Sequence, residues 1–376
     1  MKQFSLLIKP VSSQCNSDCD YCFYKNLTVY KNQQSTFMTR QVVEILIKKY
    51  LSTQQNQYIF SWQGGEPLLM GLDFYKDVIH LQQTLARPGS VIGNGIQTNG
   101  YLIDEMYADF FSTNNFLVGI SCDGPEHLHN KFRKIPDGRN AFHLVMDGIK
   151  ILQKHNVAFN TLTVVTSEHA GKGKLVYQFL KDIGSDYHQY IPCVEYDKNR
   201  KKLPWTIEGI NWGKFLIEIF QQWLIDSQKI SIRLFDSIIL VLLGQPSGIC
   251  QIERNCCQYF VVEHNGDVFP CDFFVRNDTL LGNITGNMWD DLLNSEKYRS
   301  FGTRKSLWHS DCDRCQYLKF CAGDCQKHRT GKGKSGRPKS VLCEGWQLFY
   351  KETLPEFKRI AQSYRQSYLR RMSIEF

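Results

Sequence analysis

The sequence predicts an α/β protein, with a parallel sheet of βα units in its first part and a cysteine-rich second part. Three observations support this prediction. Up to about residue 232, short β-type runs alternate with longer helical patterns, as in chains that form parallel sheets. Beyond that point the alternation stops and cysteines become frequent. The 376 residues, 42% hydrophobic and 22% charged, allow a sizeable core and exclude disordered, coiled-coil and collagen-like classes.

The first part contains six β-type runs with helical patterns between them. The runs are 5–11, 58–62, 91–98, 116–122, 160–166 and 188–195, and the helical patterns are 39–52, 73–86, 104–112, 141–155 and 173–184. Asp73 and Asn140 are expected to cap the helices that they begin. Parallel sheets of this kind bind ligands at the C-terminal ends of their strands, so we expect the chemistry in the turns QGGEP, QTNG and SCDGP.

The second part predicts a different organisation. Residues 223–244 are expected to be helical, 259–274 to form a hairpin around a His-Asn-Gly-Asp turn, and 288–301 to form one short helix. Residues 345–371 predict a basic amphipathic helix interrupted near Pro355. The change in composition places a domain boundary near 230–235, which predicts three parts: 1–232, 233–343 and 344–376.

Hydropathy and charge indicate a cytoplasmic protein with no membrane or nucleic-acid partner. The longest apolar stretch, 238–243, is too short to cross a bilayer, and the first residues lack the apolar run of a signal peptide. The net charge of +8 comes largely from 327–340 and 364–371. The first of these tracts is rich in glycine and lysine without hydrophobic periodicity, which is typical of a solvated loop.

Fourteen cysteines in a chain without an export signal favour metal binding or redox chemistry over disulfides. Cys15, Cys19 and Cys22 form C-x3-C-x2-C directly after the first strand. Three thiolates on one tight loop suit an iron–sulfur cube, and no fourth cysteine lies nearby, so one iron is left open to a reacting ligand. A zinc site completed by a distant residue is the alternative.

The turn QGGEP, residues 63–67, strengthens the case for a reacting ligand. Its glycines would let the backbone approach a bound molecule, and Glu66 offers a carboxylate to an ammonium group.

With an aromatic residue before the third cysteine and a GGE turn after the next strand, the chain resembles the radical S-adenosylmethionine (SAM) enzymes. The resemblance implies a partial (β/α)6 TIM-type barrel whose open iron binds the amino and carboxylate groups of SAM. It places Gly65 and Glu66 near the amino group of SAM, Ser121 and Arg133 at its ribose and carboxylate, and Tyr21 and Val194 beside its adenine.

Eight further cysteines make two four-cysteine sets, for which two structural zinc ions are the alternative. Their spacing, with GDVFPC and C-x2-C-x5-C-x3-C, resembles the SPASM extension of radical SAM enzymes, which binds two auxiliary [4Fe–4S] clusters. The implied ligands are Cys250, Cys256, Cys271 and Cys325 for one cluster and Cys312, Cys315, Cys321 and Cys343 for the other. Cys256 fits the spacing better than its neighbour Cys257.

The stretch CQYFVVEHNGDVFPCDFFV, residues 257–275, resembles the anaerobic sulfatase-maturating enzymes. The resemblance implies three [4Fe–4S] clusters and oxidation of a cysteine or serine in a C/S-x-P-x-R-type motif of an unfolded sulfatase to Cα-formylglycine. A 5′-deoxyadenosyl radical would abstract a Cβ hydrogen, Asp272 would act as the base, and the remaining electron would leave toward the auxiliary clusters. A reduced carrier such as flavodoxin or ferredoxin would supply electrons.

Two other functions remain open at this point. A SPASM enzyme could form thioether links or epimerised residues in another peptide, although such enzymes often carry an added N-terminal domain. A zinc-stabilised nucleic-acid-binding module would instead use the basic tracts.

Overall fold

The computed structural model describes residues 3–26, 29–30, 36–330 and 336–374, and the chain divides into two compact units. The first unit comprises Met1–Cys122, Glu126–Thr161 and Cys256–Gly302. The second comprises Asp123–Pro125, Leu162–Asn255 and Thr303–Phe376.

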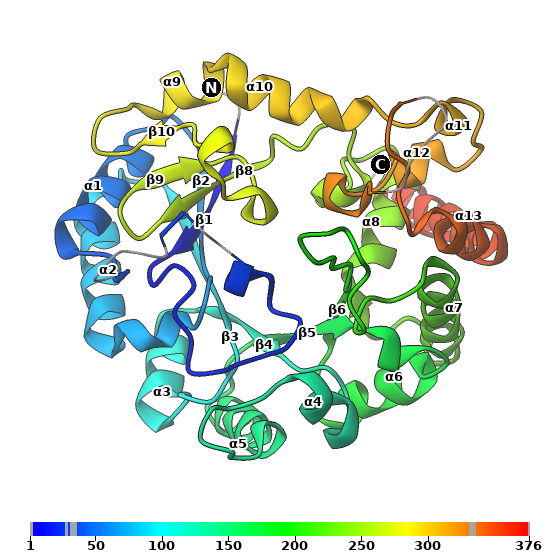
Figure 1. Cartoon of the computed structure of the whole chain (residues 1–376), viewed down its shortest axis with the longest axis horizontal. Coiled ribbons are helices and arrows are strands. Elements are labelled where there is room, and N and C mark those ends of the chain that lie inside the picture. The colour runs from blue at the N-terminus through cyan, green and yellow to red at the C-terminus, as the bar shows by residue number, and fades with distance from the viewer. Residues whose placement is uncertain (1–2, 27–28, 31–35, 331–335, 375–376) are drawn as a thin grey trace. The chain divides into compact units, whose positions relative to one another are not determined.

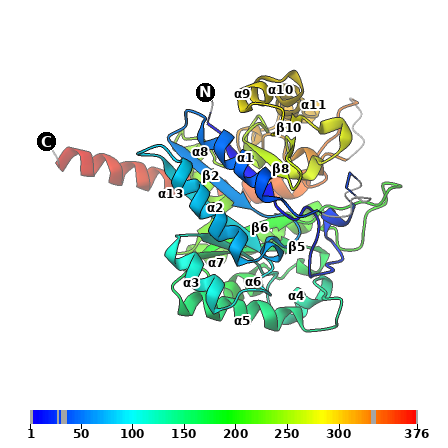
Figure 2. The ribbon, with the colours of Figure 1, turned by 90° about the vertical axis from the view of Figure 1, so that its left-hand side faces the viewer.

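The first unit is built on a sheet of strands in the order β10-β9-β8-β1-β2-β3-β4. Strands β8, β1, β2, β3 and β4 are parallel, whereas β9 and β10 continue the sheet in antiparallel fashion. Helices α1, α2 and α3 lie outside these strands (Figures 1 and 2). The elements are β1 Ser5–Lys9, α1 Arg40–Leu51, β2 Gln57–Trp62, α2 Leu72–Leu85, β3 Val91–Thr98, α3 Glu105–Thr113, β4 Leu117–Ser121, α4 Glu126–Phe132, α5 Ala141–Lys154, β8 Tyr259–Glu263, β9 Asp267–Phe269, β10 Gly282–Asn283, α9 Trp289–Asn294 and α10 Glu296–Thr303.

The register between β1 and β8 places Lys9 opposite Glu263 at the C-terminal ends of both strands. Alternation along β1 buries Leu6 and Ile8, whose partners in β2 are Phe60 and Trp62. The strand that precedes the first three cysteines is thus held on both sides by buried neighbours.

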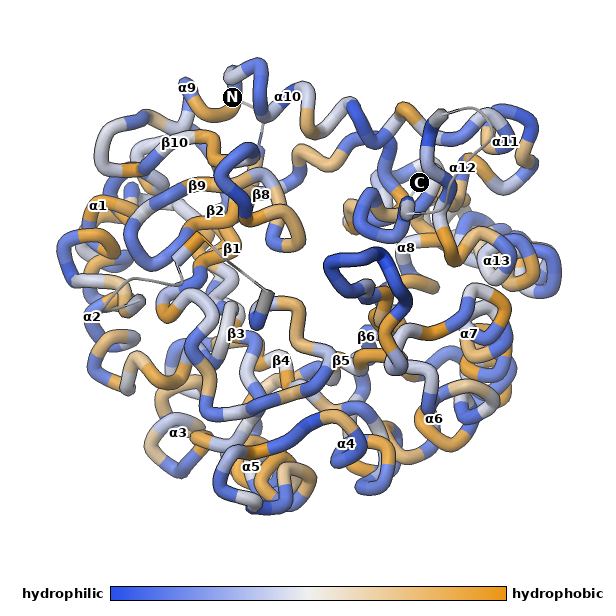
Figure 3. The backbone as a smooth tube through the Cα atoms, viewed as in Figure 1, coloured by the Kyte–Doolittle hydropathy of each residue, from blue (hydrophilic) through white to orange (hydrophobic). Residues whose placement is uncertain are grey.

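The second unit contains two parallel strands and a group of long helices. Strand β5, Phe159–Val165, begins in the first unit and ends in the second. The remaining elements are α6 Gly173–Asp182, β6 Tyr187–Pro192, α7 Gly209–Ile225, β7 Ser231–Ile232, α8 Arg233–Leu242, α11 Ser310–Asp313, α12 Leu318–Cys321 and α13 Cys343–Ile374. Hydrophobic and hydrophilic positions alternate along α7 and α13 (Figure 3), as expected of amphipathic helices. The two helices approach closely where Gly345 meets Gly209 and Gly213.

All six predicted strands and all five predicted helices of the first part are present, and so is the hairpin of β8 and β9. The cap at Asn140 is confirmed, because its side chain accepts from the His143 N–H. Asp73 was wrongly expected to cap α2, since the helix begins at Leu72 and Asp73 lies in its first turn. The helix α4 was not predicted, and neither was α7 apart from its last three residues.

Three predictions for the second part were wrong. Residues 223–244 are not one helix, because positive φ angles at Ser227 and Gln228 turn the chain into β7 before α8. Residues 288–301 form α9 and α10 rather than a single helix. Pro355 does not interrupt α13, although a proline inside a helix removes one hydrogen bond. Two residues further on, the Phe357 ring packs 4.7 Å from Phe220 of α7, and this packing favours the continuous helix Cys343–Ile374.

No helix in the described part of the chain is long and apolar enough to cross a membrane. Of the basic tract 327–340, residues 331–335 lie outside the described residues. The predicted domain boundaries remain predictions.

Candidate active site

The three N-terminal cysteines lie on the loop that follows β1 in the first unit. Ser17 contacts two of them: its N–H lies 3.4 Å from the Cys15 sulfur, and its hydroxyl lies 3.1 Å from the Cys19 sulfur. The Cys22 N–H donates to the Cys19 carbonyl. The Asn99 amide, at the end of β3, lies 3.8 Å from the Cys15 sulfur. Three thiols on one loop can bind three irons of a [4Fe–4S] cluster and leave the fourth iron open.

The GGE turn after β2 packs directly against this cysteine loop. Gly65 and Glu66 donate their N–H groups to the carbonyls of Ser12 and Gln14, at 2.8 Å each. A Cβ at Gly65 would lie 1.8 Å from the Gln14 carbonyl oxygen, and Gly64 has a φ of 122°. The glycines therefore allow two backbone segments to meet, and the turn fixes the position of the cysteine loop.

The Glu66 carboxylate is fully buried and bonded to the chain itself. It accepts from the N–H of Leu68, the hydroxyl of Thr98 and the N–H of Asn99, at 2.8 to 3.0 Å. Burial raises the pKa of Glu66 to about 7, although these three hydrogen bonds act in the opposite direction. The carboxylate thereby ties the GGE turn to the end of β3.

The predicted SAM contacts of the first unit lie near the cysteine loop or at strand ends. Tyr21 is buried, and the Arg133 guanidinium lies 5.6 Å from its ring centroid. Ser121, at the end of β4, accepts from the Gln97 amide at 3.1 Å. Val194 follows β6 in the second unit and is buried. A stacked Arg–Tyr pair and a strand-end hydroxyl are groups that can hold a charged nucleoside.

Asp272 lies directly after Cys271 and is surrounded by polar side chains from three other segments. Its Oδ2 accepts from the Tyr24 hydroxyl at 2.5 Å and from the Gln63 amide at 3.5 Å. Its Oδ1 lies 3.6 Å from the Lys9 ammonium. Only 10% of the Asp272 side chain is exposed. The carboxylate is therefore held in one orientation, while a small part of the Asp272 side chain remains accessible.

Burial raises the pKa of Asp272 above its ordinary value, although the Lys9 charge and the Tyr24 hydrogen bond oppose this shift. Lys9 also forms a 2.7 Å ion pair with Glu263, its neighbour across the β1–β8 register. Burial alone would raise the pKa of Glu263, but the Lys9 charge and smaller contributions from neighbouring side chains together outweigh it, and the pKa lies below its usual value. The buried Lys9 ammonium thus lies within 4 Å of the carboxylates of both Glu263 and Asp272.

The roles of Lys9, Tyr24 and Gln63 were not anticipated from the sequence. Lys9 carried a signal, because it is a charged residue at the end of the apolar strand SLLIK. Gln63 lies inside the QGGEP turn, but only the glycines and Glu66 of that turn were predicted to approach a bound molecule. Tyr24 carried no signal beyond its position two residues after Cys22.

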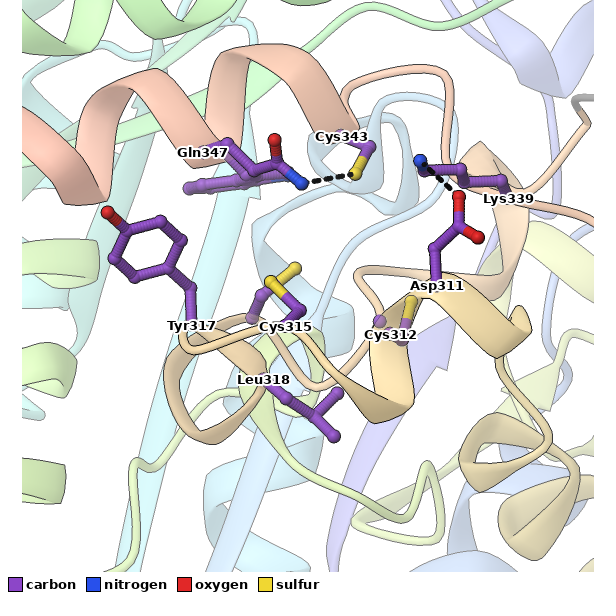
Figure 4. A pocket seen from close by; sticks show the side chains of 11 residues that line it. Asp311, Cys312, Cys315, Tyr317, Leu318, Lys339, Cys343 and Gln347 are labelled. Atoms are coloured by element: carbon purple, nitrogen blue, oxygen red, sulfur yellow. Dashed lines mark hydrogen bonds and ion pairs between the residues drawn. The ribbon is translucent and has the colours of Figure 1, made fainter.

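In the second unit, Cys312, Cys315, Cys321 and Cys343 line one pocket, as Figure 4 shows for three of them. The Gln347 amide lies 3.7 Å from the Cys343 sulfur, and Lys339 forms a 2.9 Å ion pair with Asp311 at the same pocket. These four cysteines are the set predicted for one auxiliary cluster. In the described residues, no three Cys, His, Asp or Glu side chains lie close enough to hold a single metal ion.

The other predicted set is divided between the units, and its assignment to one cluster remains a prediction. Cys256 and Cys271 lie in the first unit, whereas Cys250 and Cys325 lie in the second. The Tyr259 hydroxyl lies 3.6 Å from the Cys271 sulfur. Cys257, the neighbour of Cys256, is buried and donates its thiol hydrogen to the Tyr298 carbonyl at 3.1 Å.

Comparison with known proteins gives two family matches. Residues 10–171 match the radical SAM superfamily, and residues 250–316 match the SPASM iron–sulfur cluster-binding domain. A serine-type anaerobic sulfatase-maturating enzyme of Bacteroides thetaiotaomicron is 35% identical, over 94% of this chain and 90% of its own. A cysteine-type enzyme of Clostridium perfringens is also 35% identical, over 96% of this chain and all of its own. A solved structure of native anSMEcpe with bound AdoMet and Cp18Cys peptide matches with a TM-score of 0.87 and 35% identity, covering 96% of this chain and 99% of that one.

Proposed function

The chain belongs to the anaerobic sulfatase-maturating enzymes, which are radical SAM enzymes with a SPASM domain, and on this premise we propose a role for each part of its site. It is an oxidoreductase that converts a cysteine or serine side chain of a sulfatase to Cα-formylglycine, using [4Fe–4S] clusters and SAM. The observation that carries this conclusion is the 35% identity over 94% of the chain.

Cys15, Cys19 and Cys22 would hold the first cluster, and the remaining two sets of four cysteines would hold the auxiliary clusters. When bound, SAM and the first cluster would supply the oxidant for removing a hydrogen atom from the target Cβ, and the auxiliary clusters would supply an acceptor for the second electron. The Arg133–Tyr21 pair and Ser121 would orient SAM, together with Gly65, Glu66 and Val194. The contacts between the GGE turn and the cysteine loop support this arrangement, because they fix the cysteines beside the ends of β2 and β3.

Asp272 is the base that takes the thiol or hydroxyl proton of the target residue. The support for this role is its orientation by Tyr24, Gln63 and Lys9, and its remaining exposure. A pKa above the ordinary value for aspartate also makes it a stronger proton acceptor at neutral pH, provided that it is ionised. Lys9 favours the ionised form by its charge.

The substrate is an extended segment of a sulfatase with a C/S-x-P-x-R-type motif, and a reduced carrier such as flavodoxin or ferredoxin supplies electrons. The serine-type and cysteine-type relatives are equally similar to this chain, so identity does not distinguish the two targets.

The test uses the anaerobically reconstituted enzyme with SAM, a reductant and a pair of peptides that differ only in cysteine or serine at the target position. Mass spectrometry distinguishes replacement of the thiol by a carbonyl oxygen from loss of two hydrogens. Product from at least one peptide is expected. Iron incorporation and 5′-deoxyadenosine release without either product would contradict the proposed substrate while leaving the radical chemistry intact.

A further inference from the structure

The loop between Cys321 and Cys325 has an unusual backbone conformation. Ala322, Gly323 and Asp324 have φ angles of 45°, 70° and 62°, so three successive residues are left-handed. Only glycine adopts this conformation without a steric penalty, and two of the three residues are not glycine. The surrounding structure must therefore hold this loop in place.

Two buried cations hold the loop through its carbonyl groups. Arg329 donates to the carbonyls of Ala322, Gly323 and Asp324 at 2.8 to 3.0 Å. Lys305 is completely buried, and its ammonium donates to the Asp324 carbonyl at 3.3 Å and to the Gln251 carbonyl at 2.7 Å. Arg329 also donates to the Lys305 carbonyl at 2.6 Å, which joins the two residues into one buried group.

This group of buried charged residues connects three of the predicted cysteine ligands. Cys321 and Cys325 flank the left-handed loop, and Gln251 directly follows Cys250. A Cβ at Gly323 would lie 2.7 Å from the Arg329 guanidinium, so the glycine permits the close approach of the cation.

The positive and negative charges of this buried group are unequal in number. Asp324 is buried, and its carboxylate accepts from Gln251 at 3.0 Å and from Ser340 at 2.6 Å. It also lies 3.0 Å from the His328 ring. Among these described side chains, the one carboxylate of Asp324 is accompanied by the two cations Lys305 and Arg329, so the group carries net positive charge. A buried charge is weakly screened by solvent. Because an iron–sulfur cluster with its thiolate ligands is anionic, nearby positive charge favours the reduced state of that iron–sulfur cluster.

We propose that Lys305 and Arg329 are positioning residues that hold the loop from Cys321 to Cys325 and raise the reduction potential of the auxiliary cluster bound by Cys321. This inference rests on the proposed assignment of these cysteines as cluster ligands. It does not depend on the identity of the peptide substrate.

The test compares Lys305→Gln, which removes the charge but retains an N–H donor, with Lys305→Arg, which retains the charge. Each reconstituted full-length variant is analysed for iron and titrated electrochemically, with EPR detection of the reduced clusters and without peptide. Signals of the first cluster are identified in a Cys15→Ala/Cys19→Ala/Cys22→Ala background. Lys351→Met removes an exposed charge from α13 in the same unit and serves as the control.

We expect Lys305→Gln to retain its iron. Its equilibrium constant for reduction of one auxiliary cluster should fall about tenfold, which lowers the reduction potential of that cluster by about 59 mV for one electron. Lys305→Arg and Lys351→Met should match the wild type. An unchanged potential in Lys305→Gln, or an equal shift in Lys305→Arg, would overturn the proposal. If Lys305→Gln loses iron, Arg329→Gln and Arg329→Lys replace the pair in the same comparison. Oxidation of the sulfatase peptide is assayed separately, so failure of this inference would leave the proposed function standing.

Discussion

The Lys9 ammonium lies 2.7 Å from the Glu263 carboxylate, and neither side chain is exposed to solvent. The two residues are register partners in the adjacent parallel strands β1 and β8, although 253 positions separate them in the chain. The same ammonium lies 3.6 Å from Asp272 and 4.4 Å from the Tyr24 ring centroid. A structural ion pair between two strands is therefore also part of the environment of the proposed base.

Replacing Lys9 with methionine should destabilise the protein by about 3–5 kcal/mol, because it leaves Glu263 as a buried carboxylate without its cation. Denaturant unfolding of the reconstituted enzyme measures this change. Lys76→Met, which removes an exposed ion pair with Asp73, should change stability by less than about 1 kcal/mol. Adding Glu263→Gln to Lys9→Met should restore part of the loss, and no restoration would contradict the pairwise explanation.

Replacing Asp272 with asparagine preserves the shape of the side chain and removes its ability to accept a proton. We expect peptide oxidation to slow by about 10²–10⁴-fold, the usual contribution of a general base. Iron content and SAM binding, measured by equilibrium dialysis, should remain those of the wild type. Asp278→Asn changes an exposed carboxylate in the same segment and is the control. A peptide oxidation rate within twofold of the wild type would exclude Asp272 as the base.

The strands and the family could be predicted from the sequence because both are signalled by local patterns. Alternation and helical periodicity are encoded within windows of a few residues, and C-x3-C-x2-C is a short motif. The grouping of Cys312, Cys315 and Cys321 with Cys343 in one pocket follows from spacing together with a family resemblance.

The surroundings of Asp272 could not be predicted in this way. Asp272 lies far along the chain from Lys9, Tyr24 and Gln63, and their meeting depends on the register of β1 with β8. Similarly, the continuity of α13 through Pro355 depends on aromatic packing against α7, which outweighs the local preference of proline. Tertiary contacts decided both features.

The stability contributed by Glu66 should fall as pH rises. Its pKa is about 7 in the folded protein, above the ordinary value for glutamate, so between about pH 4.5 and 7 the folded state retains a proton that the unfolded state has lost. We therefore expect the wild type to lose about 2.5 kcal/mol more than Glu66→Gln between pH 5 and 8. Urea unfolding of the cluster-loaded enzyme without SAM, at both pH values, measures the difference. Parallel pH dependence of the two proteins would show that Glu66 has an ordinary pKa.

Replacing Gly65 with alanine should separate the GGE turn from the cysteine loop. The added Cβ would lie 1.8 Å from the Gln14 carbonyl oxygen, and backbone on both sides prevents relief by a side-chain rotation. Either the hydrogen bond from Glu66 to Gln14 breaks or the loop carrying Cys15 moves. We expect the variant to incorporate about one cluster fewer by iron analysis, and to lose most of its 5′-deoxyadenosine release.

Gly286→Ala is the matched control for this substitution, because nothing lies within 4 Å of the added Cβ and its φ is not positive. It should retain full iron content and activity. If Gly65→Ala loaded the first cluster normally and released 5′-deoxyadenosine at the wild-type rate, the turn would not be needed to position the cysteines. Loss of the auxiliary clusters instead of the first would also contradict the argument, since the contacts of Gly65 are with the loop that carries Cys15. The iron count and the EPR signal of each cluster therefore decide which loop the turn supports.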